Sequence, residues 1–144
     1  MSKEIEMYKK TIILFLVIFL NGCVTKTPYQ SIAYSGGYSS TTIDENIFKV
    51  SFKGNGFTSK ERVEDFTLLR SAEITLQYGF KYFIIINNDS YSTLTAYQNN
   101  IYSKPSSTNM IKCFKRKPKL NTIIYNADFI KKSIKEKYNL HQKT

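Results

Sequence analysis

The feature that most limits what this chain can fold into is an apolar run near its start that is followed shortly by a cysteine. Lys9 and Lys10 precede the uninterrupted apolar residues 12–20, and Cys23 follows them. A basic segment, a short apolar run and a small residue before a cleavage point are typical of a secretory signal peptide. A membrane-spanning helix needs about 20 apolar residues, so the run is too short for one. We therefore expect residues 1–22 to be a signal peptide and the fold to be built from the residues after it.

The residues around the expected cleavage point resemble a bacterial lipobox. That motif has Leu three positions before an obligatory cysteine and a small residue directly before it, and Leu20, Gly22 and Cys23 occupy these positions. In such precursors the cysteine thiol receives a diacylglycerol, and after cleavage the new amine is usually acylated. Several acyl chains anchor a protein stably, because each buried methylene contributes about 0.8 kcal/mol. We predict signal recognition through Lys9, Lys10, Leu20 and Gly22, and lipidation at Cys23.

Two further expectations come from residues beside this signal. Val24 follows the cysteine, and Asp at that position is the usual inner-membrane retention signal in enteric-type systems, so we expect the periplasmic face of the outer membrane. Glu4 and Glu6 are unusual in the basic first segment of a signal peptide, which suggests that translation starts at Met7. A chance cysteine after an ordinary secretory signal is the alternative interpretation of Cys23.

Composition divides the remaining chain into a tether, one domain and a tail. Residues 23–45 are rich in Ser, Thr, Tyr and Gly and have few aliphatic side chains, which is typical of a flexible linker. We expect this tether to lift the domain off the membrane, with its tyrosines partly against the domain. Residues 46–140 are predicted to form one small domain, and residues 141–144 a polar tail.

Hydrophobic patterning of the domain alternates between the periods of strands and helices. The predicted strands are residues 47–53, 80–86, 91–97, 111–115 and 122–125, and the predicted helices are residues 59–78 and 127–138. Residues 87–90 are expected to form a turn, and residues 98–109 a loop. This order favours an α+β fold, a two-layer sandwich in which two helices cover one face of a mixed sheet of about four to five strands.

The apolar residues of these elements indicate which sides are buried. In the first strand Phe48, Val50 and Phe52 alternate with polar residues, so one face of this strand meets the core. Residues 80–86 are almost wholly apolar, which is typical of a central strand covered on both faces. In the last helix the side chains predicted to point inward are Phe129, Ile130, Ile134 and Tyr138.

The first helix carries start and stop signals and two apolar stripes. Thr58 and Glu61 have the spacing of a capping box, and Gly79 is a typical residue at a helix end. The broad stripe consists of Phe66, Leu68, Leu69, Ala72 and Leu76, and the narrower one of Val63, Ile74 and Tyr78, beside Thr67 and Arg70. One stripe is expected to cover the sheet, and the other to meet a second helix, the tether or a partner protein.

Positive charge is concentrated in the last third of the chain. Residues 23–103 contain equal numbers of bases and acids, whereas residues 104–144 contain 11 bases and 2 acids. Such a segment attracts anionic lipid headgroups or acidic envelope polymers, and an exported protein rarely meets nucleic acid. We predict an anion-binding site formed by Lys112, Lys115, Arg116, Lys117 and Lys119. The alternative is a solvated hairpin that keeps the protein soluble.

Cysteine and histidine usage limits the available chemistry. Once Cys23 carries lipid, Cys113 has no partner within the chain, so we expect no internal disulfide. Alternation with Ile111 favours a buried Cys113 over a reactive or intermolecular thiol. The single histidine, His141, lies in the polar tail, which leaves too few ligands for a metal site. We recognise no cofactor motif and expect no cofactor.

Four short motifs together resemble those of one family. They are Gly54-Asn55-Gly56-Phe57-Thr58, Val63-Glu64-Asp65-Phe66, Leu68-Leu69-Arg70-Ser71-Ala72-Glu73 and Gly79-Phe80-Lys81-Tyr82-Phe83. The series is similar to that of a family of small bacterial lipoproteins of unknown function, first named from Caulobacter open reading frames. The resemblance covers about residues 38–86, with weaker support from Tyr125-Asn126-Ala127, where relatives tend to have Tyr-Asp-Ala. It implies an envelope lipoprotein domain and no particular activity.

Two classes of function remain. The densest set of ionisable residues is Glu64, Asp65, Arg70 and Glu73, all on the first helix. General acid–base catalysis needs two such groups in one cleft with separated pKa values, whereas a helix spreads these four over different sides. We expect structural roles instead, with Arg70 paired with Glu73 or stacked on Phe66. The predicted function is a non-catalytic module that binds an envelope protein or an anionic envelope polymer. The alternative is an envelope hydrolase or transferase with an unrecognised site.

Overall fold

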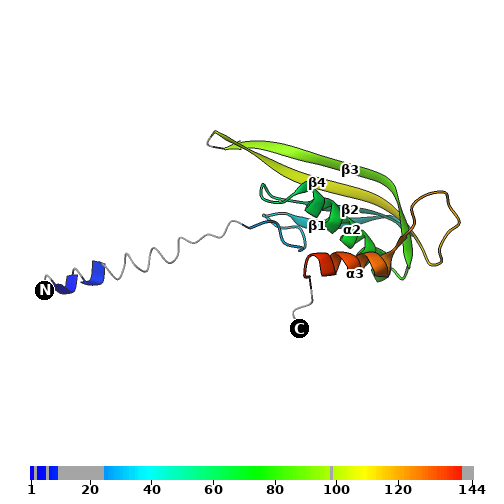
Figure 1. Cartoon of the computed structure of the whole chain (residues 1–144), viewed down its shortest axis with the longest axis horizontal. Coiled ribbons are helices and arrows are strands. Elements are labelled where there is room, and N and C mark those ends of the chain that lie inside the picture. Colours follow the sequence, from blue (N-terminus) through cyan, green and yellow to red (C-terminus); the bar gives the residue numbers. More distant parts are fainter. Residues whose placement is uncertain (2, 6, 10–24, 98, 141–144) are drawn as a thin grey trace.

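The computed structural model describes residues 1, 3–5, 7–9, 25–97 and 99–140. It has a sheet of five strands in the order β1-β2-β4-β3-β5, with helices α2 and α3 on one face (Figure 1). The elements are β1 Gly37–Asp44, β2 Ile47–Lys53, α2 Lys60–Gln77, β3 Tyr82–Tyr97, β4 Asn100–Phe114, β5 Tyr125–Asn126 and α3 Ala127–Lys137. The predicted two-layer α+β fold is confirmed. The sheet is antiparallel rather than mixed, because every neighbouring pair of strands runs in opposite directions.

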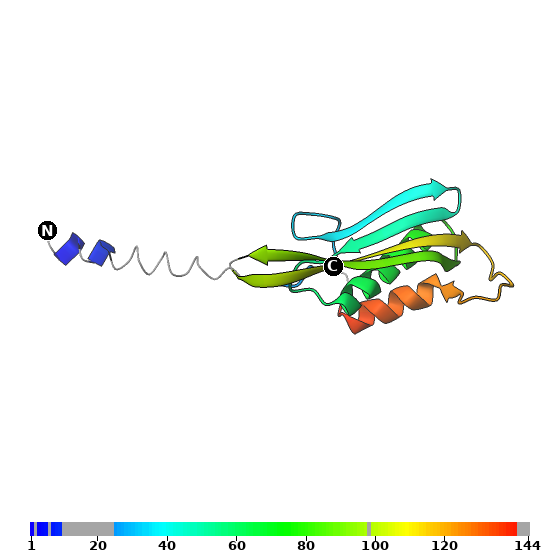
Figure 2. The same ribbon diagram turned by 90° about the horizontal axis from the view of Figure 1, so that it is seen from above.

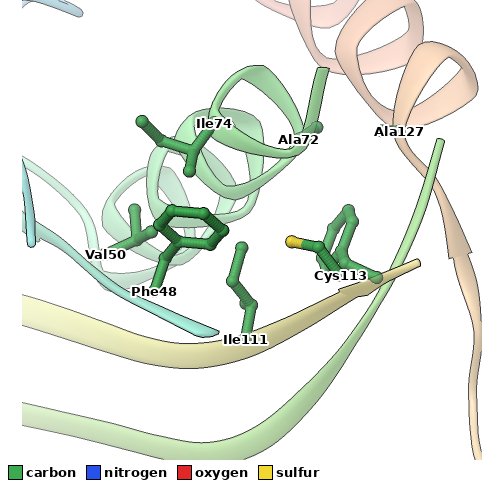
Figure 3. Packing of buried hydrophobic residues seen from close by; sticks show 8 residues of the cluster. Phe48, Val50, Ala72, Ile74, Ile111, Cys113 and Ala127 are labelled. Atoms are coloured by element: carbon green, nitrogen blue, oxygen red, sulfur yellow. The ribbon is translucent and has the colours of Figure 1, made fainter. Parts of the chain in front are cut away.

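The core lies between the sheet and α2. Phe48, Val50 and Phe52 alternate along β2 and are fully buried, as their spacing predicts. Figure 3 shows Phe48 directed toward Ile74 of α2 and lying beside Ile111 of β4. Because helix and sheet contribute side chains to the same apolar cluster, removal of this cluster from water holds the two layers together.

Cys113 lies in this core, on β4. Its side chain is 1% exposed and forms no disulfide, so the predicted burial is confirmed. The Cys113 sulfur lies 3.3 Å from the hydroxyl of Thr75 on α2. Burial raises the pKa of the Cys113 thiol above its ordinary value, because the thiolate would lose its hydration. The neutral thiol therefore packs as a small apolar side chain.

The N-cap of helix α2 lies one residue later than the predicted one. The N-cap is Ser59, whose hydroxyl accepts a hydrogen bond from the backbone N–H of Arg62 at 3.2 Å. The predicted capping box of Thr58 and Glu61 is therefore wrong. The Thr58 hydroxyl instead donates to the side chain of Asn55 at 2.8 Å, which draws it away from the helix.

Helix α2 ends at Gln77, two residues before Gly79, the residue from which its end is predicted. The side of α2 that faces the sheet includes Thr67, Ser71 and Thr75, all fully buried. Each of these hydroxyls donates to the backbone carbonyl four residues earlier, at 2.8 Å. Their burial is therefore tolerated, since no donor is left without an acceptor.

Strands β3 and β4 form one long hairpin that was not predicted. Residues 87–90, expected to be a turn, continue β3, and residues 98–109, expected to be a loop, belong mostly to β4. The turn lies instead at Asn99, whose φ of +64° is a left-handed conformation that Asn tolerates. Asn is uncommon in strands, but the Asn88 amide donates across the hairpin to the side-chain oxygen of Asn109 at 2.6 Å.

The apolar strand predicted at residues 80–86 is covered on one side only. Phe83 is fully buried, whereas Ile86 is 47% exposed. The prediction of burial on both faces is wrong because α2 and α3 both lie on the same face of the sheet (Figure 1). The strand register also shifts between Ile85 and Asn87, which places Ile86 at a bulge.

The expected tether is part of the folded domain. Strand β1 pairs with β2, so residues 37–44 belong to the sheet. Thr27 is fully buried, and the ring of Tyr29 lies 5.2 Å from that of Phe66 on α2. The predicted domain boundary at residue 46 is therefore wrong. The lack of aliphatic residues in this segment suggested a linker. Thr27 and Tyr29 pack against the domain in place of aliphatic side chains.

Helix α3 packs beside α2 (Figure 2). Its N-cap is Asn126, whose side chain accepts a hydrogen bond from the backbone N–H of Phe129 at 3.1 Å. Asn is among the residues most favoured at this position of a helix. Ile134 is buried as predicted, but Phe129 is 69% exposed. At 3.6 residues per turn, Phe129 lies on the same side as Lys132 and not on the side of Ile134.

Candidate functional site

Residues 54–58, the first motif of the resemblance, fasten the N-terminal segment to the start of α2. The Asn55 side chain donates to the carbonyl of Thr25 at 2.8 Å, and the Asn55 backbone N–H donates to the Thr27 hydroxyl at 2.8 Å. The Thr27 backbone N–H donates to the Thr58 hydroxyl at 2.9 Å. The three bonds form one network, in which Asn55 binds both Thr25 and Thr27, and Thr27 also binds Thr58. Because Thr27 is also fully buried, the chain is held in place from Thr25 onward.

A two-stranded arm extends beyond this point. Strand β2 pairs with β4 only as far as Lys53 opposite Ser106, so residues 91–97 and 99–105 of the hairpin continue without it, on the left in Figure 2. We call residues 25–27, residues 53–58 and this arm the Thr25 end. The pairing brings Lys53 close to Lys104 although the two are far apart in the sequence.

Three adjoining hollows lie at the Thr25 end. The first has a volume of about 480 Å³ and is lined by Thr25, Asn55, Gly56, Phe57, Thr95, Tyr102 and Lys104. The second and third have volumes of about 340 and 260 Å³. Lys104 lines all three and Lys53 lines two, and none of the residues described as lining them is acidic. The hollows therefore form a neutral to positive surface.

These residues were missed at the level of sequence. Lys53 and Lys104 are isolated lysines in segments with little net charge, and only the strand register places them together. Lys104 belongs to the basic last third of the chain, but the sequence predicts a loop at this position. The motif at residues 54–58 was the one available signal, because glycines in a turn allow close approach of another chain segment.

Glu73 connects three parts of the fold. Its carboxylate accepts a hydrogen bond from the Tyr29 hydroxyl at 2.6 Å and lies 3.4 Å from Arg70 and 3.1 Å from Lys135 of α3. The predicted pairing of Arg70 with Glu73 is thus confirmed, and the Arg70 guanidinium lies over the ring of Tyr38, 4.4 Å from its centroid. Burial, together with the bond to Glu73, raises the pKa of Tyr29 far above its ordinary value.

Asp65 connects α2 to the end of α3. It accepts hydrogen bonds from the ammonium group of Lys137 and from the hydroxyl of Tyr138, both at 2.7 Å, and Glu61 accepts a second bond from Lys137 at 2.6 Å. The bonds to Asp65 and Glu61 raise the pKa of Lys137. Burial and the bond to Asp65 raise the pKa of Tyr138 to about 12.

The four ionisable residues singled out on α2 do not meet in one cleft. Glu64 is exposed and lies 3.7 Å from Lys60. Asp65 and Glu73 bind separate partners, as described above, and none of the four lines the three hollows. Their contacts are those of links between elements of the fold.

We expect the domain to lose stability as the pH rises from about 10 toward about 12. The folded-state pKa values of Tyr138 and Lys137 both lie above their ordinary values of 10.0 and 10.5. Their contributions are therefore fully present below those ordinary values and are lost as the pH rises through the raised ones. Thermal unfolding midpoints measured from about pH 8 upward should fall less steeply for Tyr138→Phe, which cannot ionise there. An equally steep fall in that variant would contradict the assignment.

The predicted anion-binding residues lie at the other end of the sheet. Lys112 is half-buried on β4, and the other four side chains are exposed in the loop of residues 115–124, here called the basic loop. The strand predicted at residues 122–125 is only the two-residue strand β5, Tyr125–Asn126, so the loop before it is longer than predicted. From Ser106 to Phe114, β4 rises roughly 27 Å, so the basic loop and the Thr25 end lie far apart. Figure 1 shows them on opposite sides of the domain.

None of these five residues lines the three hollows at the Thr25 end. The basic loop presents Lys115, Arg116, Lys117 and Lys119 to solvent. Whether they bind an anion stays a prediction.

The predicted lipidation signal falls mostly outside the described residues. Lys10, Leu20, Gly22 and Cys23 are not among them, while Lys9 is described as exposed and helical. Lipidation of Cys23 therefore stays a prediction.

Comparisons of the chain with models of protein families, with curated proteins and with solved structures found no match. Among the described residues, no helix is both long and apolar enough to cross a membrane. The same part of the chain contains no group of three or more His, Cys, Asp or Glu side chains that could hold a metal ion.

Proposed function

We propose that this chain is a lipid-anchored protein of the bacterial envelope, held at Cys23, whose basic loop binds an acidic surface of a partner protein. The observation that carries the proposal is the arrangement of the two ends. The residue that follows the proposed anchor by two positions, Thr25, is fixed in the fold at one end, and the basic loop is exposed at the other. An anchored domain of this kind would present the loop away from its own membrane.

Distance supports a partner other than the anchoring lipid. The strand that connects the two ends rises roughly 27 Å, whereas charges in physiological salt are screened over about 8 Å. Cations of the basic loop would therefore feel little attraction to headgroups at the Thr25 end. Their partner is expected to lie deeper in the envelope.

Apolar side chains beside these cations favour a protein over a polysaccharide. Leu120 and Ile123 of the basic loop are 48% and 70% exposed, and Phe129 follows at the start of α3 with 69%. Apolar side chains rimmed by charge are typical of surfaces that bind other proteins. The positive charge would steer an acidic partner to the loop and raise its association rate. The module needs no catalytic group for this role.

The anchoring itself is tested by mass spectrometry. We expect the mature protein to begin at Cys23 and to carry diacylglycerol and a third acyl chain on that residue. Cys23→Ser should lose the lipid and accumulate as the uncleaved precursor. A wild-type mature protein without lipid would contradict the proposal.

The partner is tested by photocrosslinking in intact cells. A photoreactive amino acid in place of Ile123 should capture a discrete protein at an acid-rich peptide. The adduct should disappear when Lys115, Arg116, Lys117 and Lys119 are changed to Ser. The matched control is the same probe at Ile43, which is likewise exposed, at 53%, but lies on β1. Capture of wall or lipopolysaccharide fragments, or equal capture from Ile43, would overturn the assignment of a protein partner.

A further inference from the structure

We propose that the hollow lined by Phe57, Tyr102 and Lys104 binds the anionic headgroup of a phospholipid in the membrane that holds Cys23. The inference rests on the proposed lipidation and adds a second, non-covalent contact with the membrane. The hollow has a volume of about 480 Å³ and opens at the Thr25 end. One wall is the turn that carries Phe57, and the other is the hairpin arm with Tyr102 and Lys104.

The length of chain between the anchor and the hollow places it at the membrane surface. Thr25 lines the hollow, and its carbonyl is held by Asn55 at 2.8 Å. Two residue steps separate Cys23 from Thr25 and span at most about 7 Å. A diacylglycerol on the Cys23 sulfur keeps that residue at the level of the headgroups. The hollow must then lie within reach of neighbouring lipids, with no tether to move it away.

Charge selects an anionic headgroup as the occupant. Lys104 lines the hollow and both of its neighbours, Lys53 lines those neighbours, and no acidic side chain lines any of the three among the described residues. Lys26, directly after Thr25, is also exposed. A lysine held at an anionic surface strengthens binding roughly fivefold. Three lysines close to the anchor therefore favour anionic over zwitterionic lipids.

The apolar side chains of the Thr25 end suit the boundary between headgroups and acyl chains. Phe57 is 50% exposed, and its ring centroid lies 6.3 Å from that of Tyr102. Leu94 and Ile101, on the arm, are 69% and 75% exposed. Pairing of Leu94 with Ser103 and of Ala96 with Ile101 puts both on one face of the arm, and Tyr102 and Lys104 lie on the other face. Aromatic and aliphatic side chains of this kind gather at membrane interfaces.

The experiment uses the full lipidated protein in vesicles of phosphatidylcholine, with or without phosphatidylglycerol. A photoreactive phenylalanine analogue in place of Phe57 should form an adduct with the mass of phosphatidylglycerol. Lys104→Ala should lower its yield roughly fivefold. Lys119→Ala, the same change in the basic loop, is the matched control and should leave the yield unchanged. Added inorganic phosphate should not compete, because the proposed occupant is the headgroup of a lipid that stays in the bilayer and not a free anion.

Several outcomes would overturn the inference. Equal adduct yields with the two lipids would show that charge does not select the occupant, and competition by free phosphate would assign the site to a soluble anion. Absence of a lipid adduct from protein that stays on the vesicles would refute headgroup binding by the hollow but not the proposed anchoring. Absence of lipid on Cys23, read by mass spectrometry of the same sample, would refute the proposed anchoring and this inference together.

Discussion

Replacement of Phe66 by alanine is expected to lower the free energy of unfolding by about 3–5 kcal/mol, the usual cost of truncating a buried phenylalanine. The Phe66 side chain is fully buried on α2. Its ring centroid lies 5.1 Å from that of Phe52 on β2, 5.2 Å from Tyr29 and 4.9 Å from Tyr138. Truncation would therefore leave a cavity where the sheet, the N-terminal segment and Tyr138, the C-cap of α3, all meet α2.

A second phenylalanine provides the control. Phe129→Ala removes the same side chain from α3, but Phe129 is 69% exposed, so its cost should stay within about 0.5 kcal/mol. Urea unfolding of the full chain carrying Cys23→Ser, followed by circular dichroism, measures both without interference from lipid. Equal losses in the two variants would show that this aromatic cluster does not hold the elements together.

The parts of the fold that sequence analysis predicted are those with local signals. Strand β2 was found because Phe48 and Phe52 alternate with polar residues, and the end of α2 because Gly79 follows it. Both signals lie within a few residues of the feature they predict. The contacts that hold α2 against the rest of the chain have no such local signal. Tyr29 bonds Glu73 across 44 positions, and nothing near either residue indicates the other.

The long hairpin was missed because its polar residues resemble a turn. Asn88 and Ser90 are typical of turns, yet they stand opposite Asn109 and Ser107, and each donates a side-chain hydrogen bond across the pair, at 2.6 and 3.3 Å. The ladder is stabilised by partners that single-segment propensity cannot see. With the turn predicted at residues 87–90, the sequence does not predict the arm. It therefore does not place Lys104 at the Thr25 end either.

The location of the candidate site follows from the same long-range contacts. The spacing of Thr58 and Glu61 predicted the start of a helix, but it gave no sign that Asn55 and Thr58 bind Thr25 and Thr27. A segment read as a flexible tether would allow any orientation of the domain above a membrane. A segment fixed from Thr25 onward allows only a narrow range, and both proposals depend on that restriction.

The fixed N-terminal segment gives the second large prediction, which concerns Gly36. We expect Gly36→Ala to lower the free energy of unfolding by roughly 3 kcal/mol. Gly36 has φ +103°, and an added Cβ would collide with the backbone carbonyl oxygen of Lys53 and lie 3.1 Å from the side chain of Thr27. Gly79→Ala is the matched control, because its φ is +79° and no atom lies within 4 Å of the added Cβ. That variant should cost only about 1 kcal/mol, from the backbone conformation alone.

Trypsin cleavage after Lys26 shows whether the loss at Gly36 reaches the proposed anchor. Lys26 is exposed, but Thr27 beside it is fully buried, so a protease must open the segment before it can cut there. A difference of about 2 kcal/mol between the two variants corresponds to roughly 30-fold more of the open segment. Gly36→Ala should therefore yield a fragment that begins at Thr27 far faster than Gly79→Ala or the wild type. Equally fast cleavage in all three would mean that the segment is already free, and the domain would then stand on a tether without a defined orientation.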